Sequence, residues 1–360
     1  MSPEINKAGI SRRKVLMGAA AATLAMPFVS RRNSWAASNQ LVVRSPGGTV
    51  EAIRKTAVWD PFTKETGIEI IPVPATAGKL FSMFKSGNIE LDLIDVAGGT
   101  LIILQREGAL APIDYASWKK VDPAKIDPAF REEYFSSYSL FASVIGYNKE
   151  SFAGRDHPKT WAELWDVEKF PGVRSMADIG AGNVNLEEAL MADGVAPEDI
   201  YPLDLDRAFK ALSRIKPHVP KFWDSGALSA QMLTSREADV GAIWHTRLVG
   251  ALKSGAPVDM EWSQHVLFRQ MYGIYKDAKN MEGAQRLVEF SLLPEIQAAV
   301  NVQTSSGSVN SEAYKFIPAE AAALMPGAPQ QQAKGLVADD FWWADNREEV
   351  ARRWADWIRT

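Results

Sequence analysis

The chain has 360 residues, of which 46% are apolar, and it contains no cysteine. No disulfide or lipidated cysteine can form, so the fold must be stable through its core alone. The formal net charge is −4, which excludes the basic excess that binding to nucleic acid or to an anionic membrane surface requires. A chain of this length and composition is long enough to form two lobes.

Residues 1–36 have the pattern of an export signal. Arg12 and Arg13 precede an alanine-rich apolar stretch that runs to Val29, and Ser34-Trp35-Ala36 offers small residues for cleavage. Twin arginines favour the Tat pathway. The apolar stretch is shorter than the roughly 20 residues that a membrane anchor needs. We therefore expect a cleaved Tat-type signal peptide and a periplasmic mature protein, whose net charge is about −9 because the signal carries six basic residues and one acidic residue.

The stretch from Leu41 to Val73 predicts a strand, a helical region and a second, parallel strand. Leu41-Val42-Val43 is typical of a buried strand, and it ends at the turn Ser45-Pro46-Gly47-Gly48-Thr49. Thr49 is expected to cap the next helix, and Asp60-Pro61 predicts the start of a second short helix. Because open α/β sheets bind ligands at the carboxyl ends of their strands, we expect Gly47, Gly48 and Thr49 to contact a ligand.

A second segment repeats this design. Residues 91–96 predict a strand, and Ala97-Gly98-Gly99-Thr100 predicts a loop before a helix over 101–107. The two loops should meet at the same edge of one sheet, because their strands are expected to be parallel. Backbone N–H groups and the hydroxyl of Thr100 would then contribute to the same cleft, so Gly98, Gly99 and Thr100 are predicted ligand contacts.

The rest of the chain continues this alternation. We expect strands at 141–149, 239–244, 258–262 and 271–275, with helices over 186–191, 206–215, 227–236 and 281–292. Thr160 is a predicted helix cap. The tryptophans near the predicted helices are expected to pack inside a lobe rather than to bind a ligand; these are Trp161, Trp165, Trp354 and Trp357.

Four segments resemble the extracellular solute-binding proteins of ABC importers, in particular the spermidine/putrescine-binding branch. They are the stretch GGTVEAIRKTAVWDPFTKETGIEI over 47–70, Tyr147-Asn148-Lys149 followed by Pro158-Lys159-Thr160-Trp161, the G-x-x-W strand end at Gly241 to Trp244, and the turn over 305–310. The resemblance covers residues 41–360. It implies an α/β, type II periplasmic-binding-protein fold with two lobes, each a mostly parallel sheet flanked by helices, and a ligand cleft between them.

The same resemblance implies a division of the chain and a role. Lobe 1 is expected over 37–139 and 270–310, and lobe 2 over 140–269 and 311–360. The expected role is the periplasmic substrate-binding component of an ABC transporter, which closes around a small polar solute by hinge motion and delivers it to the membrane permease. We expect a monomer.

No arrangement of residues indicates catalysis. The sequence has no G-x-S-x-G, no P-loop and no G-x-G-x-x-G, and its four histidines are scattered without metal-ligand spacing. We therefore predict that the protein is not an enzyme and that it has no catalytic residue, no metal and no cofactor. A periplasmic enzyme on the same framework and a ligand sensor that signals to a receptor are the alternatives from other classes.

Aromatic residues are the second group of predicted ligand contacts. Phe141, Trp223, Trp244 and Phe268 offer ring faces over which a ligand ammonium is stabilised by roughly 0.5–2 kcal/mol. Trp244 is favoured as a contact because it ends a strand at the expected cleft. For Trp223, core packing explains the residue equally well.

The identity of the ligand stays open between two classes. The resemblance implies a polyamine such as putrescine or spermidine, held by two carboxylates, but the corresponding positions hold Gly180-Ala181 and Gln270, which carry no charge. Arg247 and Arg269 instead suit an amino acid or another compound that carries a carboxylate. Gln270 and both arginines are predicted site residues. Three acids are candidate replacements for the missing carboxylates, and these are Asp178, Asp224 and Glu261.

Overall fold

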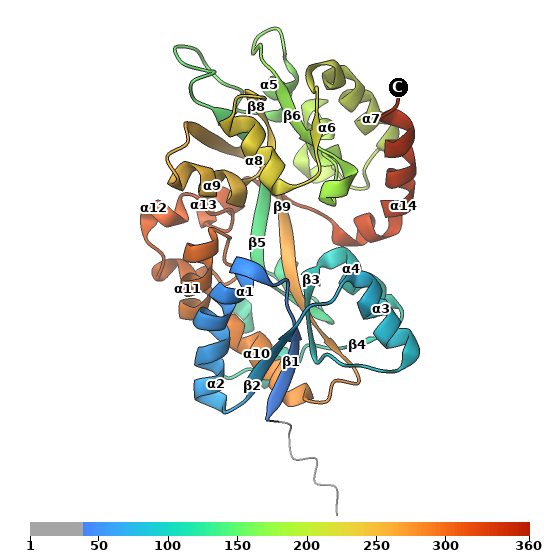
Figure 1. Ribbon diagram of the computed structural model, residues 1–360, viewed down its shortest axis with the longest axis vertical. Helices are drawn as coiled ribbons and strands as arrows, with labels where there is room; N and C mark the ends of the chain where they lie inside the picture. Colours follow the sequence, from blue (N-terminus) through green and yellow to red (C-terminus); the bar gives the residue numbers. More distant parts are fainter. Residues whose placement is uncertain (1–38) are drawn as a thin grey trace, which may run out of the picture. The chain divides into compact units, whose positions relative to one another are not determined.

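The computed structural model describes residues 39–360, so the expected signal peptide lies outside the described residues. One mixed sheet has the strand order β2-β1-β3-β9-β5-β8-β6-β7, with β4 and β10 also paired to β9 (Figure 1). The strands are Gln40–Arg44 (β1), Glu69–Val73 (β2), Leu93–Ala97 (β3), Leu110–Ala111 (β4), Phe135–Asn148 (β5), Arg174–Ala177 (β6), Phe222–Trp223 (β7), Val240–Trp244 (β8), Val258–Tyr275 (β9) and Gly335–Val337 (β10).

Helices flank this sheet on both sides. They are Gly48–Arg54 (α1), Asp60–Thr66 (α2), Ala77–Ser86 (α3), Gly98–Arg106 (α4), Trp161–Trp165 (α5), Leu186–Ala192 (α6), Leu205–Ile215 (α7), Gly226–Thr234 (α8), His245–Lys253 (α9), Met281–Ser291 (α10), Pro294–Thr304 (α11), Ala319–Ala322 (α12), Pro329–Gln332 (α13) and Asp340–Trp357 (α14). A π-helical turn covers Lys55–Trp59, and 3-10 turns cover Tyr115–Ser117, Pro123–Lys125, Pro128–Phe130, Ile179–Ala181, Pro197–Asp199, Lys216–His218 and Ser311–Lys315. Across residues 39–360, none of the helices combines the length and the hydrophobicity that crossing a bilayer requires.

The first strand, helix and strand have the predicted parallel pairing. β1 pairs with β2 in parallel, and β3 lies on its other side, also in parallel. The predicted cap was wrong, because α1 begins after Gly47, at φ 75°, with no side-chain hydrogen bond from Thr49. A second short helix, α2, begins at Asp60 with Pro61 in its first turn, as predicted, but it continues directly from the π-helical turn, so Asp60 lies within a helical run.

Two long antiparallel strands, β5 and β9, connect the lobes (Figure 1). We predicted two separate strands at 258–262 and 271–275, whereas β9 is one strand of 18 residues. The pairing runs from Phe135 opposite Gly273 to Asn148 opposite Val258, and its register shifts twice, after Ser137 and after Ser143. Residues of the two strands between the lobes therefore lie at the bottom of any space that the lobes enclose.

Each lobe has its own hydrophobic core. In lobe 1, Leu41, Phe62 and Leu93 pack with Leu287 of α10, and in lobe 2 Trp161 packs with residues of α6 and α7. The predicted packing role of the tryptophans is confirmed. Trp161 is fully buried, Trp165 donates its indole N–H to the carbonyl of Ala211, and the rings of Trp354 and Trp357 lie 4.9 Å apart in the lobe 2 core.

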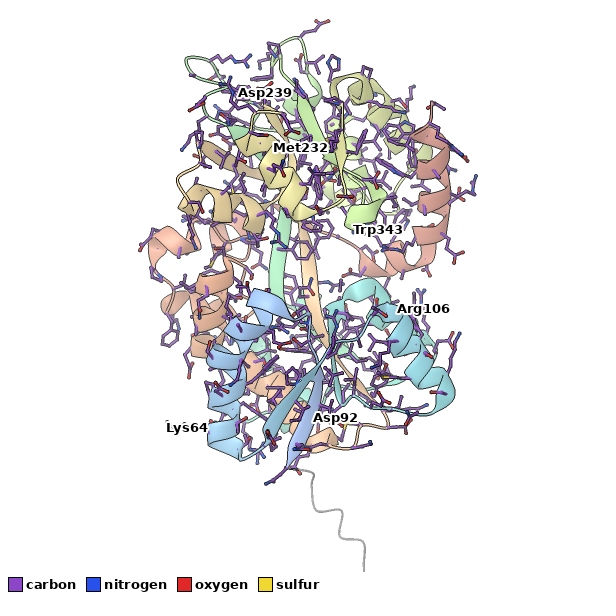
Figure 2. The ribbon with its side chains drawn as sticks, viewed as in Figure 1. Lys64, Asp92, Arg106, Met232, Asp239 and Trp343 are labelled. Carbon is purple, nitrogen blue, oxygen red and sulfur yellow. The ribbon has the colours of Figure 1, made fainter. Side chains whose placement is uncertain are left out.

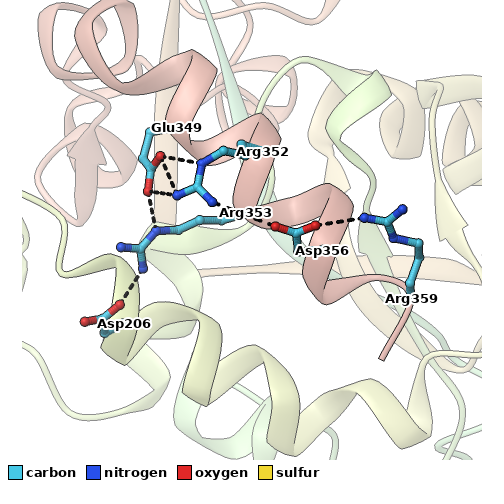
Figure 3. A network of polar contacts seen from close by, with 6 residues as sticks. All are labelled: Asp206, Glu349, Arg352, Arg353, Asp356 and Arg359. Carbon is cyan, nitrogen blue, oxygen red and sulfur yellow. Dashed lines mark hydrogen bonds and ion pairs between the residues drawn. The ribbon is translucent and has the colours of Figure 1, made fainter.

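The last helix, α14, contacts both cores. Phe341 and Ala344 in its first turns pack against the lobe 1 cluster that includes residues of α4, while Trp343 and Trp354 belong to the core of lobe 2. A network of ion pairs on its outer face joins Arg353 to Glu349 and to Asp206 of α7 (Figure 3). Surface pairs of this kind contribute little to stability individually, so the buried tryptophans are the main anchor of α14 to lobe 2.

Candidate ligand-binding site

A cavity of about 660 Å³ lies where α3, α4, β5, β8, β9 and α14 meet. Lobe 1 contributes Phe81, Gly99, Thr100 and Ile103, and residues 181–183 contribute from lobe 2. The carboxyl ends of β3 and β8 open onto it, through the first residues of α4 and through Trp244. A second cavity, of about 510 Å³, lies beside Trp118 between α2 and α10 and contains none of the predicted site residues.

Three of the four predicted aromatic residues line the larger cavity together. The ring of Phe141 stacks on that of Phe268 with 5.2 Å between centroids, and it meets Trp244 edge to face at 5.9 Å. Trp223 does not line the cavity. It is 1% exposed, donates its indole N–H to the carbonyl of Ala242 and packs edge to face behind Trp244 at 5.4 Å. Trp223 therefore supports the Trp244 ring from the core.

The structure separates the two predicted glycine loops. Gly99 and Thr100 line the cavity, but they lie in the first turn of α4 rather than in a loop. The first N–H groups of a helix have no intrahelical acceptor, so polar donors remain available there. Gly98 is buried, and a Cβ atom at this position would lie 2.5 Å from Cγ of Asp340, so its role is close packing. The other predicted loop does not line the cavity; its residues are Gly47, Gly48 and Thr49.

The predicted cation Arg269 lines the cavity, but its guanidinium already has partners. It is 6% exposed and lies 2.7 Å from Oδ2 of Asp340, 3.4 Å from Oε1 of Glu132 and 2.5 Å from the carbonyl oxygen of Ala129. Burial raises the pKa of Asp340, and the nearby Arg269 opposes that rise. Arg269 therefore forms a buried ion pair in the cavity wall. Gln270, the next residue of β9, also lines the cavity.

Arg247, in the first turn of α9, lies at the edge of the site. Its side chain is exposed and is not among the lining groups, but a Cβ atom at Gly226 would lie 2.8 Å from both its Cγ atom and the Trp244 ring. Within residues 39–360 it makes no ion pair. It therefore stays a candidate for a ligand carboxylate beside Trp244.

The candidate replacement acids do not line the cavity. Asp178 accepts a hydrogen bond from the backbone N–H of Gly180 and another from Trp354, and Glu261 pairs with His157 at 2.6 Å. Asp224 packs beside Gly180, where a Cβ atom would lie 3.3 Å from its Cβ atom. These contacts with Gly180, Trp354 and His157 indicate that Asp178 and Glu261 have structural roles.

α14 provides a wall of the cavity that the sequence pattern did not predict. Asp345, Arg347 and Glu348 line the cavity together with Ala344, and their i, i+3 and i+4 spacing places them along one face of the helix. Asp345 forms an ion pair with Arg106 of α4, in which Nη2 lies 3.0 Å from Oδ2 and Nη1 binds Oδ1 (Arg106 is labelled in Figure 2). Arg347 and Glu348 are exposed and make no ion pair with the described part of the chain.

A buried carboxylate holds another lining residue in place. Trp343 of α14, labelled in Figure 2, donates its indole N–H to Oε1 of Glu187 at 2.6 Å, and the hydroxyl of Tyr201 donates to the same oxygen at 2.6 Å. Burial, and secondarily the neighbouring Glu188, raise the pKa of Glu187 to about 7. Glu187 therefore fixes one aromatic wall of the cavity.

The described residues contain no group of three or more histidine, aspartate or glutamate side chains that could hold a metal ion. His245 is buried, with Nδ1 accepting from the backbone N–H of Ala142 and Nε2 lying 2.8 Å from the carbonyl oxygen of Ser305. Both of its ring nitrogens are thus satisfied by the fold.

Two α/β lobes joined by long antiparallel strands, with an aromatic and charged cavity at their junction, define a two-lobed solute-binding protein. Comparison with known proteins specifies the family. Residues 57–357 match the family described as bacterial extracellular solute-binding protein, and the chain belongs to this family. It is the periplasmic solute-binding component of an ABC transporter, and the proteins of this family are binding proteins rather than enzymes.

Individual relatives cover most of the chain. A gamma-aminobutyric acid-binding protein of Pseudomonas aeruginosa is 27% identical over 329 residues, which is 89% of this chain and 92% of the relative. A spermidine/putrescine-binding periplasmic protein of Haemophilus influenzae is 28% identical over 273 residues, 72% of this chain and 74% of the relative.

Solved structures agree with this assignment. The structure of the Atu4243-GABA receptor is 34% identical, covers 88% of this chain and 97% of its own, and has a TM-score of 0.79. An ABC transporter substrate-binding protein from Bradyrhizobium japonicum is also 34% identical, covers 89% and 99%, and has a TM-score of 0.77. The predicted family resemblance and fold class are confirmed.

Proposed function

We propose that the protein captures a short amino acid whose ammonium and carboxylate groups lie at opposite ends, and delivers it to the permease. The charge balance of the cavity carries this proposal. Two of its three acids already have arginine partners, in the pairs Asp340 with Arg269 and Asp345 with Arg106. One carboxylate, Glu348, and one guanidinium, Arg347, remain without an ion pair in residues 39–360. A zwitterion supplies one opposite charge for each of them.

A polyamine fits this balance less well. Each ammonium that leaves water needs a nearby opposite charge. Among the described residues that line the cavity, Glu348 is the one carboxylate without an ion pair, so the second ammonium of a polyamine would have no carboxylate partner. Gln270 occupies a position where the polyamine-binding branch was expected to place an acid. Relatives named for gamma-aminobutyric acid and for spermidine/putrescine both occur, so we keep a polyamine as the second candidate class.

The aromatic wall suits the apolar part and the ammonium of such a ligand. Phe141, Trp244 and Phe268 form one connected group of rings. A cation over an aromatic face gains roughly 0.5–2 kcal/mol.

Ligand capture is proposed to work by hinge closure. Residues from α4 in lobe 1 and from 181–183 in lobe 2 line the same cavity, so a ligand that contacts both favours the conformation in which they are close. The closed form then docks on the permease as a monomer. We further propose the lobe boundaries given by the sequence, and export of the chain by the Tat pathway through residues 1–36.

A ligand screen tests the proposal. The purified protein is heated with 4-aminobutyrate, putrescine, spermidine, α-amino acids, betaines, organic acids or orthophosphate. A ligand at 100 times its dissociation constant stabilises a protein by roughly 2.7 kcal/mol, which raises Tm by several degrees. Stabilisation by 4-aminobutyrate or a similar ω-amino acid is expected. Stabilisation by polyamines alone, or by acids without an amine, would refute the zwitterion assignment, and consumption of the bound ligand followed by NMR would indicate an enzyme.

A further inference from the structure

We propose that Arg106 determines ligand specificity by neutralising an acid of the cavity wall, so that the site rejects diamines. This inference rests on the proposed function and adds a residue that lies outside the cavity itself. Asp345 lines the cavity, whereas Arg106 does not. Arg106 belongs to α4, which packs in the core of lobe 1, whereas Asp345 lies in the part of α14 that contacts the cores of both lobes.

The geometry of the pair occupies both oxygens of Asp345. Nη1 of Arg106 binds Oδ1, and Nη2 binds Oδ2 at 3.0 Å. A two-point contact of this kind fixes the planes of guanidinium and carboxylate together. Arg106 also lies in the last turn of α4, where the helix dipole favours a positive charge. The carboxylate of Asp345 therefore already has a cationic partner before any ligand enters the cavity.

The exposure of the pair between Arg106 and Asp345 indicates that its main role is not to stabilise the fold. The side chains are 45% and 56% exposed, and pairs of this kind contribute little to folding stability. A diamine and a matching ω-amino acid of the same length differ in one terminal charge. The second ammonium of a diamine would need the Asp345 carboxylate, but both oxygens of that carboxylate are already bound by Arg106. A carboxylate at that end of the ligand needs no such partner.

A matched pair of ligands tests this reading. Putrescine and 4-aminobutyrate share a four-carbon spacing and differ in one terminal group, so the ratio of their dissociation constants, measured by calorimetry, isolates the effect of that charge. In Arg106→Gln, the affinity for putrescine relative to that for 4-aminobutyrate should rise by about fivefold, which is the size of effect that an exposed ion pair can produce. The double variant Arg106→Gln with Asp345→Asn should lose this gain, because it also removes the unmasked acid.

The control is Arg352→Gln, which removes the same charge from a surface pair with Glu349 on α14, outside the cavity lining (Figure 3). Its ratio should equal that of the parent protein. An equal change for both ligands in Arg106→Gln would identify a simple latch between the lobes and overturn the inference, as would an unchanged ratio or a gain that persists in the double variant. A parent protein that binds neither compound refutes the proposed function before any variant is compared.

Discussion

Replacing Trp244 by alanine should weaken ligand binding while leaving the protein folded. The indole is half-buried and meets Phe141 and Trp223 edge to face at 5.9 and 5.4 Å. Two aromatic pairs at about 0.5–1.5 kcal/mol each predict a loss of about 1–3 kcal/mol of unfolding free energy. This is smaller than the roughly 5–15 kcal/mol that a folded domain typically has. Loss of the ring face should weaken binding of the ammonium by more than about 1 kcal/mol, or about fivefold.

Two measurements separate these effects. Denaturant unfolding gives the change in stability, and titration calorimetry of the folded protein gives the change in affinity. Trp244→Phe should recover most of the affinity, because it keeps an aromatic face. Trp354→Ala is the matched control: this tryptophan is 2% exposed in the lobe 2 core, so its loss should lower stability without changing the affinity of the folded protein. An affinity of Trp244→Ala within twofold of the parent would show that Trp244 is a core residue.

Three further predictions concern stability. The folded state raises the pKa of Glu187 to about 7, so the folded protein binds a proton at this carboxyl group more tightly than the unfolded chain does. The unfolding free energy should therefore fall as pH rises from about 4.5 to 7. Glu187→Gln should reduce this slope in denaturant titrations, and an unchanged slope would contradict the assignment. Gly241→Ala would place Cβ 2.1 Å from a carbonyl oxygen of β6, so we expect the unfolding free energy to fall by about 3 kcal/mol. Gly250→Ala lies in open space on α9 and should raise the unfolding free energy by about 0.5–1 kcal/mol. Equal effects of the two variants in calorimetric melts would refute the packing argument. Asp340→Asn leaves Arg269 buried without its closest carboxylate and should cost about 3 kcal/mol, measured by urea unfolding, with a neutral result showing that Glu132 replaces it.

The strand pattern of the fold could be predicted from the sequence where apolar residues were contiguous. β3 and β8 are mostly buried strands of this kind, β1 alternates buried and partly buried residues, and all three were located within a few residues. β9 was divided in two, because its middle contains polar and charged residues such as Gln264, Arg269 and Gln270. These residues belong to the stretch between the lobes, where a strand faces a cavity or an ion pair instead of a continuous core. The hydrophobic pattern is therefore weakest where the site is built.

The site was predictable in its aromatic part and not in its charged part. Phe141 begins one predicted strand and Trp244 ends another, so the expected topology brought these two together, whereas Phe268 lies between two predicted strands and joins them because β9 is continuous. Glycines suggested a loop at Gly98 and Gly99, whereas both lie in the first turn of α4 and Gly98 lets that helix begin against Asp340. Nothing in the linear pattern of α14 indicates which of its faces would meet the cavity, since that depends on how its tryptophans pack in lobe 2.

The interleaved order of the sheet has a consequence for how the chain folds. Leu93 of β3 pairs with Ile274 of β9, and β10 adds to β9 only after residue 334 has been made. α14, the last helix, supplies Trp343 and Trp354 to the second core. Neither lobe can be completed from an N-terminal fragment, and unfinished chains would expose the unpaired edges of β3 and β5. Such long-range pairing slows folding and lengthens the period in which the newly made chain depends on chaperones.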